Sequence, residues 1–262
     1  MDLIDAFRRD GAVLLRGAIP PGLIDVLREG VEANLAAPSP RAKIASETDD
    51  PGAFIEDFCN WRENPFYHRF IFECGLGEVA GRLTGSRTVR LYHDHMLTKT
   101  AGTRQPTPWH QDQPYYNIDG AQTCSVWIPL DPVDSASTLQ FVAGSHLGPW
   151  LMPRTFRDSQ ARWFPEGSLA ELPDIDARRS DFRILAWELA PGDVVAFNML
   201  TLHAAAGSPR DRRVFSVRYI GDDVTHAPRR WLTSPASPGL DKDLAAGAPL
   251  DHPLFPVVWS AP

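Results

Sequence analysis

Apolar and polar positions follow a helical spacing near the N-terminus of the chain. Between residues 23 and 35, apolar residues recur with a period close to 3.6, which is typical of an amphipathic helix. Residues 2–9 also predict a short helix, and residues 65–83 predict a helical stretch that is broken or kinked at Gly75 and Gly77. A β-like run at 12–16 separates the first two helices, and the charged, proline-containing residues 37–53 predict a loop.

From about residue 86 the pattern changes to short β-like runs separated by Gly/Pro turns. These runs cover residues 88–98, 121–130, 138–142, 194–197 and 212–220. Many short strands favour a sandwich or barrel. Residues 147–182 are polar and predict an insertion, either a lid over a site or a plain surface excursion. The proline-rich tail 227–262 is expected to wrap the surface.

Because the sequence contains no internal repeat, we expect one domain over residues 1–262, with N-terminal helices at about 1–85 and a β core at about 86–221. The net charge of −7 argues against nucleic acid as a partner. No run of about 18 apolar residues predicts a membrane span, and the N-terminus lacks a signal-peptide pattern. Three scattered cysteines indicate reduced thiols, so a cytoplasmic location is expected. The oligomeric state stays open.

The stretch His110-Gln111-Asp112 carries the first candidate chemistry. Residues at i and i+2 of an extended chain point to the same face, so the imidazole and the carboxylate can reach one point. A second histidine would complete the two-His, one-carboxylate set of mononuclear non-heme Fe(II) oxygenases. His203, just past the strand at 194–197, is the candidate, and a core or loop histidine is the alternative. His93 and His95 form a competing pair on the preceding strand.

The strand at 212–220 offers a cation for a dicarboxylate co-substrate. A guanidinium suits a carboxylate because two parallel N–H donors match two oxygens. Alternation places Arg212, Ser216 and Arg218 on one face and Arg213 on the other. The more polar face is expected to line a wet pocket, which favours Arg212 over Arg213. The alternative is that both arginines are exposed at a sheet edge.

The order of these motifs resembles the phytanoyl-CoA dioxygenase family of Fe(II)- and 2-oxoglutarate-dependent oxygenases, from residue 7 to about 219. The resemblance is carried by His110-x-Asp112, Gly144-Ser145-His146, Pro191-Gly192-Asp193, His203 and Arg212. It implies a mainly β fold with flanking helices, namely a double-stranded β-helix (a cupin-like jelly roll). It also implies iron at His110, Asp112 and His203, with 2-oxoglutarate anchored by Arg212.

Family members line the co-substrate pocket at the positions of Met96 and Trp127, which would otherwise be ordinary core residues. Lys99 is a further candidate to hold a carboxylate, with an exposed lysine as the alternative. One departure is the run His203-Ala204-Ala205, because relatives often have a serine two residues after this histidine. Without this serine, the hydroxyl contact to 2-oxoglutarate that relatives make is not expected here.

The implied reaction consumes O2, hydroxylates a C–H bond of a small-molecule substrate, and yields succinate and CO2. Asp112 favours oxygenation, because related halogenases have a small residue there. Substrate contacts are expected from the aromatic Trp150 of the insertion and from residues just after the His110-x-Asp112 motif. The residues after the motif are Gln113, Tyr115, Tyr116 and Asn117. The alternative function is a non-catalytic jelly-roll protein that binds a metal or ligand.

Overall fold

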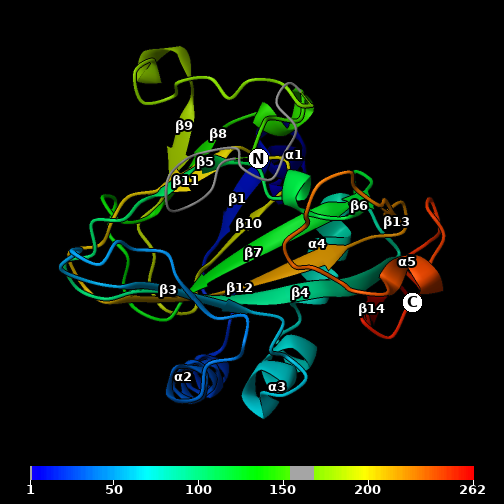
Figure 1. Cartoon of the computed structure of the whole chain (residues 1–262), viewed down its shortest axis with the longest axis horizontal. Helices are drawn as coiled ribbons and strands as arrows, with labels where there is room; N and C mark the ends of the chain where they lie inside the picture. Colours follow the sequence, from blue (N-terminus) through cyan, green and yellow to red (C-terminus); the bar gives the residue numbers. More distant parts are fainter. Residues whose placement is uncertain (1, 154–167) are drawn as a thin grey trace.

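Two antiparallel sheets form the centre of the computed structural model, which describes residues 2–153 and 168–262 (Figure 1). The larger sheet has the order β1-β10-β7-β12-β4-β3-β2, and β14 also pairs with β4. Its strands are β1 (Ala12–Leu15), β2 (Lys43–Ile44), β3 (Phe54–Phe58), β4 (Thr88–Lys99), β7 (Thr123–Pro129), β10 (Val194–Phe197), β12 (Arg212–Ile220) and β14 (Val257–Ser260). The smaller sheet contains β5 (Thr107–His110), β11 (His203–Ala205), β8 (Leu139–Val142) and β9 (Ile184–Ala186), in that order. A third sheet pairs β6 (Ile118–Asp119) with β13 (Thr225–His226).

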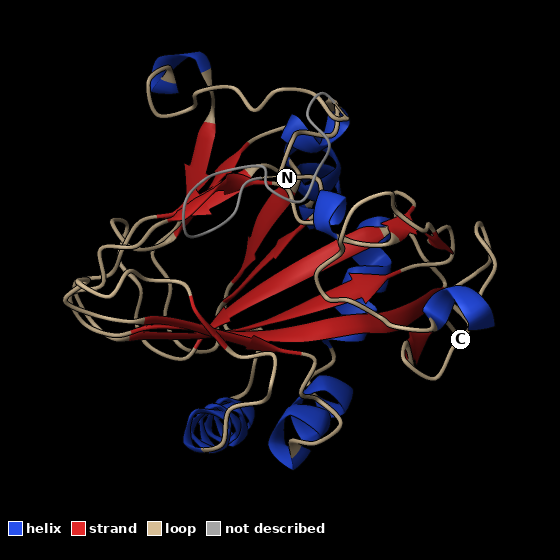
Figure 2. Ribbon diagram, viewed as in Figure 1, coloured by secondary structure: helices blue, strands red, loops and turns tan. Residues whose placement is uncertain are grey.

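The helices α1 (Leu3–Asp10), α2 (Pro21–Ala36), α3 (Pro65–Glu73) and α4 (Leu76–Thr84) pack against the larger sheet. The short α5 (Leu240–Asp243) lies apart from them, because its Leu240 packs in a separate cluster with Tyr115 and Tyr116. Figure 2 shows α2 and α3 on one side of this sheet and the smaller sheet on the other. A buried cluster joins helix residues such as Leu27 and Phe70 to Val126, Phe215 and Val217 of the strands. Burial of this apolar surface holds the helices against the sheet.

A second apolar cluster lies between the two sheets. It includes Trp127, Phe197 and Val214 from the larger sheet and Phe141 and Ala205 from the smaller one. Because side chains alternate along a strand, Val214 faces this space while Phe215 faces the helices. The inner face of the larger sheet is therefore the face that can line a site between the sheets.

The predicted fold, a mainly β jelly roll with flanking helices, is confirmed. Gly75, in the left-handed conformation with φ of 74°, separates α3 from α4, as predicted. Gly77 instead lies within α4, where it packs against Val258 and Trp259, so the prediction of a break there was wrong.

Two other predictions were incomplete. The predicted loop 37–53 contains β2, and the surface tail 227–262 contributes β14 to the larger sheet. In the predicted insertion 147–182, residues 154–167 lie outside the described part of the chain. Within the described residues, none of the helices is long and apolar enough to cross a membrane.

Candidate metal centre

Pairing between β5 and β11 brings the three candidate ligands together. His203 lies directly opposite His110 in this pairing, and Asp112 follows the end of β5 by two residues. One ligand atom from each of the three lies within 4.8 Å of the others. Asp112 Oδ1 lies 3.5 Å from His110 Nε2 and 3.7 Å from His203 Nε2. Among the described residues, no other set of three His, Cys, Asp or Glu side chains converges in this way.

The histidine rings are oriented by backbone carbonyls. His110 Nδ1 lies 2.8 Å from the carbonyl oxygen of Pro108, and His203 Nδ1 lies 2.8 Å from that of Thr201. Burial, together with the nearby His110, lowers the pKa of His203 to about 3, so this ring is neutral at neutral pH. A carbonyl only accepts, so His203 carries its proton on Nδ1 and directs the Nε2 lone pair towards Asp112.

The buried carboxyl group of Asp112 is ionised. Burial alone would raise its pKa, but the charge of Arg218 and a hydrogen bond with His110 hold it well below the usual range. A carboxylate oxygen and an imidazole lone pair therefore face each other across less than 4 Å. Two acceptors in this position fit a cation between them, and the two-His, one-carboxylate set suits Fe(II).

Arg212 lines the same narrow cavity as His110 and His203. It is buried, and its Nη1 donates to the carbonyl oxygen of Ser137. Its guanidinium carbon lies 5.9 Å from the ring centre of Trp127, which also lines the cavity. Burial lowers the pKa of Arg212 to about 10, which still leaves it charged at neutral pH.

Arg213 points the other way. It forms ion pairs of 2.6 Å with both Asp131 and Glu32 near the surface. The structure therefore brings Arg212, and not Arg213, to the metal centre. This placement follows the alternation along β12.

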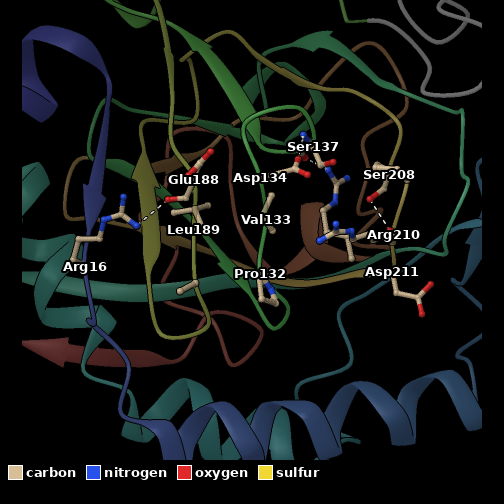
Figure 3. Close-up of a pocket in the computed structure, with 13 residues that line it drawn as sticks. Arg16, Pro132, Val133, Asp134, Ser137, Glu188, Leu189, Ser208, Arg210 and Asp211 are labelled. Carbon is tan, nitrogen blue, oxygen red and sulfur yellow. Dashed lines mark hydrogen bonds between the residues drawn. The ribbon is translucent and has the colours of Figure 1, made fainter.

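A second pocket, of about 430 Å³, also has Arg212 among its lining residues. Its charged lining includes Arg16, Asp134, Glu188 and Arg210, which are labelled in Figure 3. Arg212 therefore borders both the metal cavity and this second pocket.

Two further residues were expected beside the co-substrate, and the structure places them differently: Met96 faces away from the cavity, whereas Lys99 lies opposite Arg212 in the β4–β12 pairing. Met96 belongs to the apolar cluster beneath the helices, because its neighbours His95 and Leu97 take the cavity face of β4. The expectation for Met96 was therefore wrong. Lys99 is fully buried, and its Nζ donates to the carbonyl oxygens of Gln105 and Ala206 at 2.7 and 2.9 Å. Burial, with Arg212 nearby, lowers the pKa of Lys99 to about 6.

Of the four predicted substrate contacts, only the two tyrosines approach the centre. The Tyr115 ring lies edge-on to His110, with ring centres 6.0 Å apart, and Tyr116 interacts electrostatically with the buried Arg218. Gln113 instead donates to the carbonyl oxygen of Gly120, and Asn117 accepts from the Tyr92 hydroxyl. These bonds hold Gln113 and Asn117 within the loop. Neither side chain is among the described residues that line the cavity.

Three further side chains near the metal centre were not predicted as part of it. Ser125 Oγ donates to Asp112 Oδ2 at 2.8 Å, and Arg218 Nε lies 3.4 Å from the same oxygen. His95 lines the cavity, and its Nε2 lies 3.3 Å from Glu56 Oε2. Alternation along β12 placed Arg218 on the cavity face, but nothing in the sequence indicated Ser125 or Glu56. The pairing of His95 with Glu56 also argues against His93 and His95 as the metal pair.

A sequence model of the phytanoyl-CoA dioxygenase (PhyH) family matches residues 7–214. No curated protein matches the chain. Among solved structures, the epimerase SnoN in complex with Fe3+, alpha ketoglutarate and nogalamycin RO is 20% identical, with a TM-score of 0.77, over 98% of this chain and 97% of that one.

Two further structures are similar. The alpha ketoglutarate dependent carbocyclase SnoK is 22% identical, with a TM-score of 0.73, over 97% of this chain and 94% of that one. EctD from S. alaskensis with 2-oxoglutarate and 5-hydroxyectoine is 19% identical, with a TM-score of 0.67, over 97% of this chain and 89% of that one. At these identities the structures establish a shared fold.

The family match supports a more specific assignment than the shared fold alone. It spans more than half of the chain, and it contains the three converging side chains as well as Arg212. The chain therefore belongs to the phytanoyl-CoA dioxygenase family and is an enzyme that uses iron and 2-oxoglutarate.

Proposed function

We propose that the protein hydroxylates a C–H bond of a small-molecule substrate, with succinate and CO2 formed from 2-oxoglutarate. The observation that carries the proposal is the position of Arg212 in the same cavity as His110 and His203, with Asp112 between the two imidazoles. A metal centre and a carboxylate anchor in one enclosed space suit a bound 2-oxo acid.

Each residue of the site has a distinct proposed role. His110, Asp112 and His203 would hold the iron through one face and leave the opposite face open. Arg212 would bind the distal carboxylate of 2-oxoglutarate through parallel N–H groups, while Trp127 packs beside its guanidinium. When bound, iron and 2-oxoglutarate supply the oxidation of the substrate by O2. Phe197, Leu97 and Val214 give the cavity an apolar wall that excludes water.

The similar solved structures support this proposal and also define the main alternative reactions. SnoN and EctD were crystallised with alpha ketoglutarate or 2-oxoglutarate, and the EctD crystal also contained a hydroxylated compound, 5-hydroxyectoine. SnoN is an epimerase and SnoK is a carbocyclase. Asp112 keeps the carboxylate ligand, which argues against halogenation, and we propose oxygenation as the outcome for this chain.

Succinate formation is the direct test. The protein should convert 2-oxoglutarate to succinate in an Fe(II)-dependent manner, and Asp112→Ala should abolish this conversion. Asp119→Ala is the matched control, because Asp119 pairs with Arg229 in a separate small sheet. A panel of small-molecule substrates then distinguishes the outcomes by product mass. Gain of one oxygen supports hydroxylation, unchanged mass indicates epimerisation, and loss of two hydrogens indicates ring closure.

The non-catalytic alternative makes a different prediction. A protein of that kind would bind Fe(II) and still form no succinate with any member of the panel. We further propose that the whole chain acts as one catalytic domain, since β14 near the C-terminus pairs with β4, which also carries the cavity residue His95.

A further inference from the structure

The two oxygens of the Asp112 carboxylate have different surroundings. Oδ1 faces both imidazoles, at 3.5 Å from His110 Nε2 and 3.7 Å from His203 Nε2. Oδ2 is turned away from them. It accepts a hydrogen bond of 2.8 Å from Ser125 Oγ and lies 3.4 Å from Arg218 Nε. Only one oxygen is therefore presented to the metal position.

The contacts on Oδ2 come from the opposite sheet. Asp112 follows β5 of the smaller sheet, whereas Ser125 is in β7 and Arg218 is in β12 of the larger one. Ser125 and Arg218 lie directly opposite each other in the β7–β12 pairing. Both are buried, with Ser125 at 0% exposed and Arg218 at 6%. They place a hydroxyl donor and a guanidinium charge, both fixed in the sheet, at the position where Asp112 arrives.

The charge of Arg218 explains why this contact is stable. A buried guanidinium is costly unless an anion lies close to it. Among the described residues, Asp112 is the carboxylate within ion-pair distance of Arg218. Arg218 also interacts electrostatically with Tyr116. Rotation of Asp112 to present both oxygens to a metal would remove Oδ2 from both of its contacts, the Ser125 hydroxyl and the Arg218 guanidinium.

We infer that Ser125 and Arg218 are positioning residues that make Asp112 a one-oxygen ligand of the iron, an inference that rests on the proposed function. A six-coordinate metal with three protein ligand atoms keeps three positions. These suffice for the two atoms of a chelating 2-oxo acid and for O2. A carboxylate bound through both oxygens would take one of those positions. The hydrogen bond from Ser125 and the charge of Arg218 on Oδ2 therefore keep the metal centre open.

The test uses Co(II) as the metal probe and the full metal-free chain, titrated without oxygen. Loss of such outer contacts typically weakens metal binding 10–100-fold. We expect that loss for Ser125→Ala, together with a changed Co(II) visible absorption spectrum, because the released carboxylate can bind through both oxygens. Ser125→Thr keeps the hydroxyl and should restore both properties. Arg218→Lys should weaken binding and shift the spectrum in the same direction.

Ser86→Ala is the matched control. Ser86 is also a buried serine whose Oγ donates to an aspartate, at 2.9 Å from Asp222 Oδ2, but it is not among the residues that line the metal cavity. This variant should bind Co(II) with the wild-type affinity and spectrum. Wild-type behaviour of Ser125→Ala, or equal losses in Ser125→Ala and Ser86→Ala, would overturn the inference.

Two more measurements separate the other outcomes. If thermal melting shows that Ser125→Ala does not fold, Arg218→Lys decides the question, and an unchanged Co(II) spectrum in that variant counts against the inference. A failure of the proposed function has a different signature. His110→Ala would then bind Co(II) as tightly as the wild type, which would mean that the metal is not held at this centre.

Discussion

Replacement of Arg212 by alanine should impair the use of 2-oxoglutarate far more than replacement of Arg213. Arg212 is 6% exposed, and it lies in the cavity of the metal centre. Truncation of one partner in a buried, hydrogen-bonded charge pair costs about 2–5 kcal/mol. At about 1.4 kcal/mol per tenfold change, the apparent KM for 2-oxoglutarate should rise roughly 30-fold to 3,000-fold. Arg212→Lys, which keeps the charge but loses the planar fork, should fall between the wild type and Arg212→Ala.

Arg213 provides the control on the neighbouring position. Its side chain is 27% exposed, and its ion pairs with Asp131 and Glu32 lie away from the cavity. Pairs of this kind contribute about 0–1 kcal/mol to stability, so Arg213→Ala should leave the KM close to that of the wild type. The assay is succinate formation at varied 2-oxoglutarate, with anaerobic titration of the Fe(II) protein as an independent measure of binding. Equal effects of the two variants, or a larger effect of Arg213→Ala, would refute the reasoning.

Two further predictions concern stability. The pKa of Lys99 is about 6 in the folded protein and about 10.5 when unfolded, so the unfolded chain binds an extra proton between these values. The stability of the wild type relative to Lys99→Met should therefore fall as the pH decreases from 10.5 to 6, which urea unfolding at pH 9 and pH 7 would measure. A constant difference would contradict this explanation. In Gly81→Ala, the new Cβ would lie 2.4 Å from a ring carbon of Trp259, so we expect a loss of about 1–3 kcal/mol in a thermal melt. Gly22→Ala, which meets nothing within 4 Å, should be neutral or stabilising, and equal melting temperatures for both variants would show that Trp259 moves aside.

Local patterns were sufficient to predict the elements with strong periodicity. The helix at 23–35 and the strand at 212–220 both appear near their expected positions. By contrast, β11 has three residues and two of them are alanines, so its pattern is too short to detect. The strand β14 lies in a proline-rich tail, and its pairing with β4 is a long-range contact that no local window contains.

The residues of the candidate site also fall into those that the sequence could predict and those that it could not. His110, Asp112 and His203 could be proposed from residue type and order, and strand alternation separated Arg212 from Arg213. Met96 was misplaced because the family resemblance was followed where alternation with His95 and Leu97 pointed to the other face. Ser125 gave no signal, because its role depends on the approach of Asp112 from the opposite sheet.

The outer edge of β4 is shared by two short partners from distant parts of the chain. β3 pairs with residues 95–99 of this strand, while β14 pairs with residues 88–90. Removal of β14 would leave unpaired N–H and C=O groups on a long strand that is otherwise buried in the sheet. Exposed backbone of this kind recruits strands from other molecules. A chain shortened before Val257 should therefore tend to self-associate, even though every residue of the metal centre is still present.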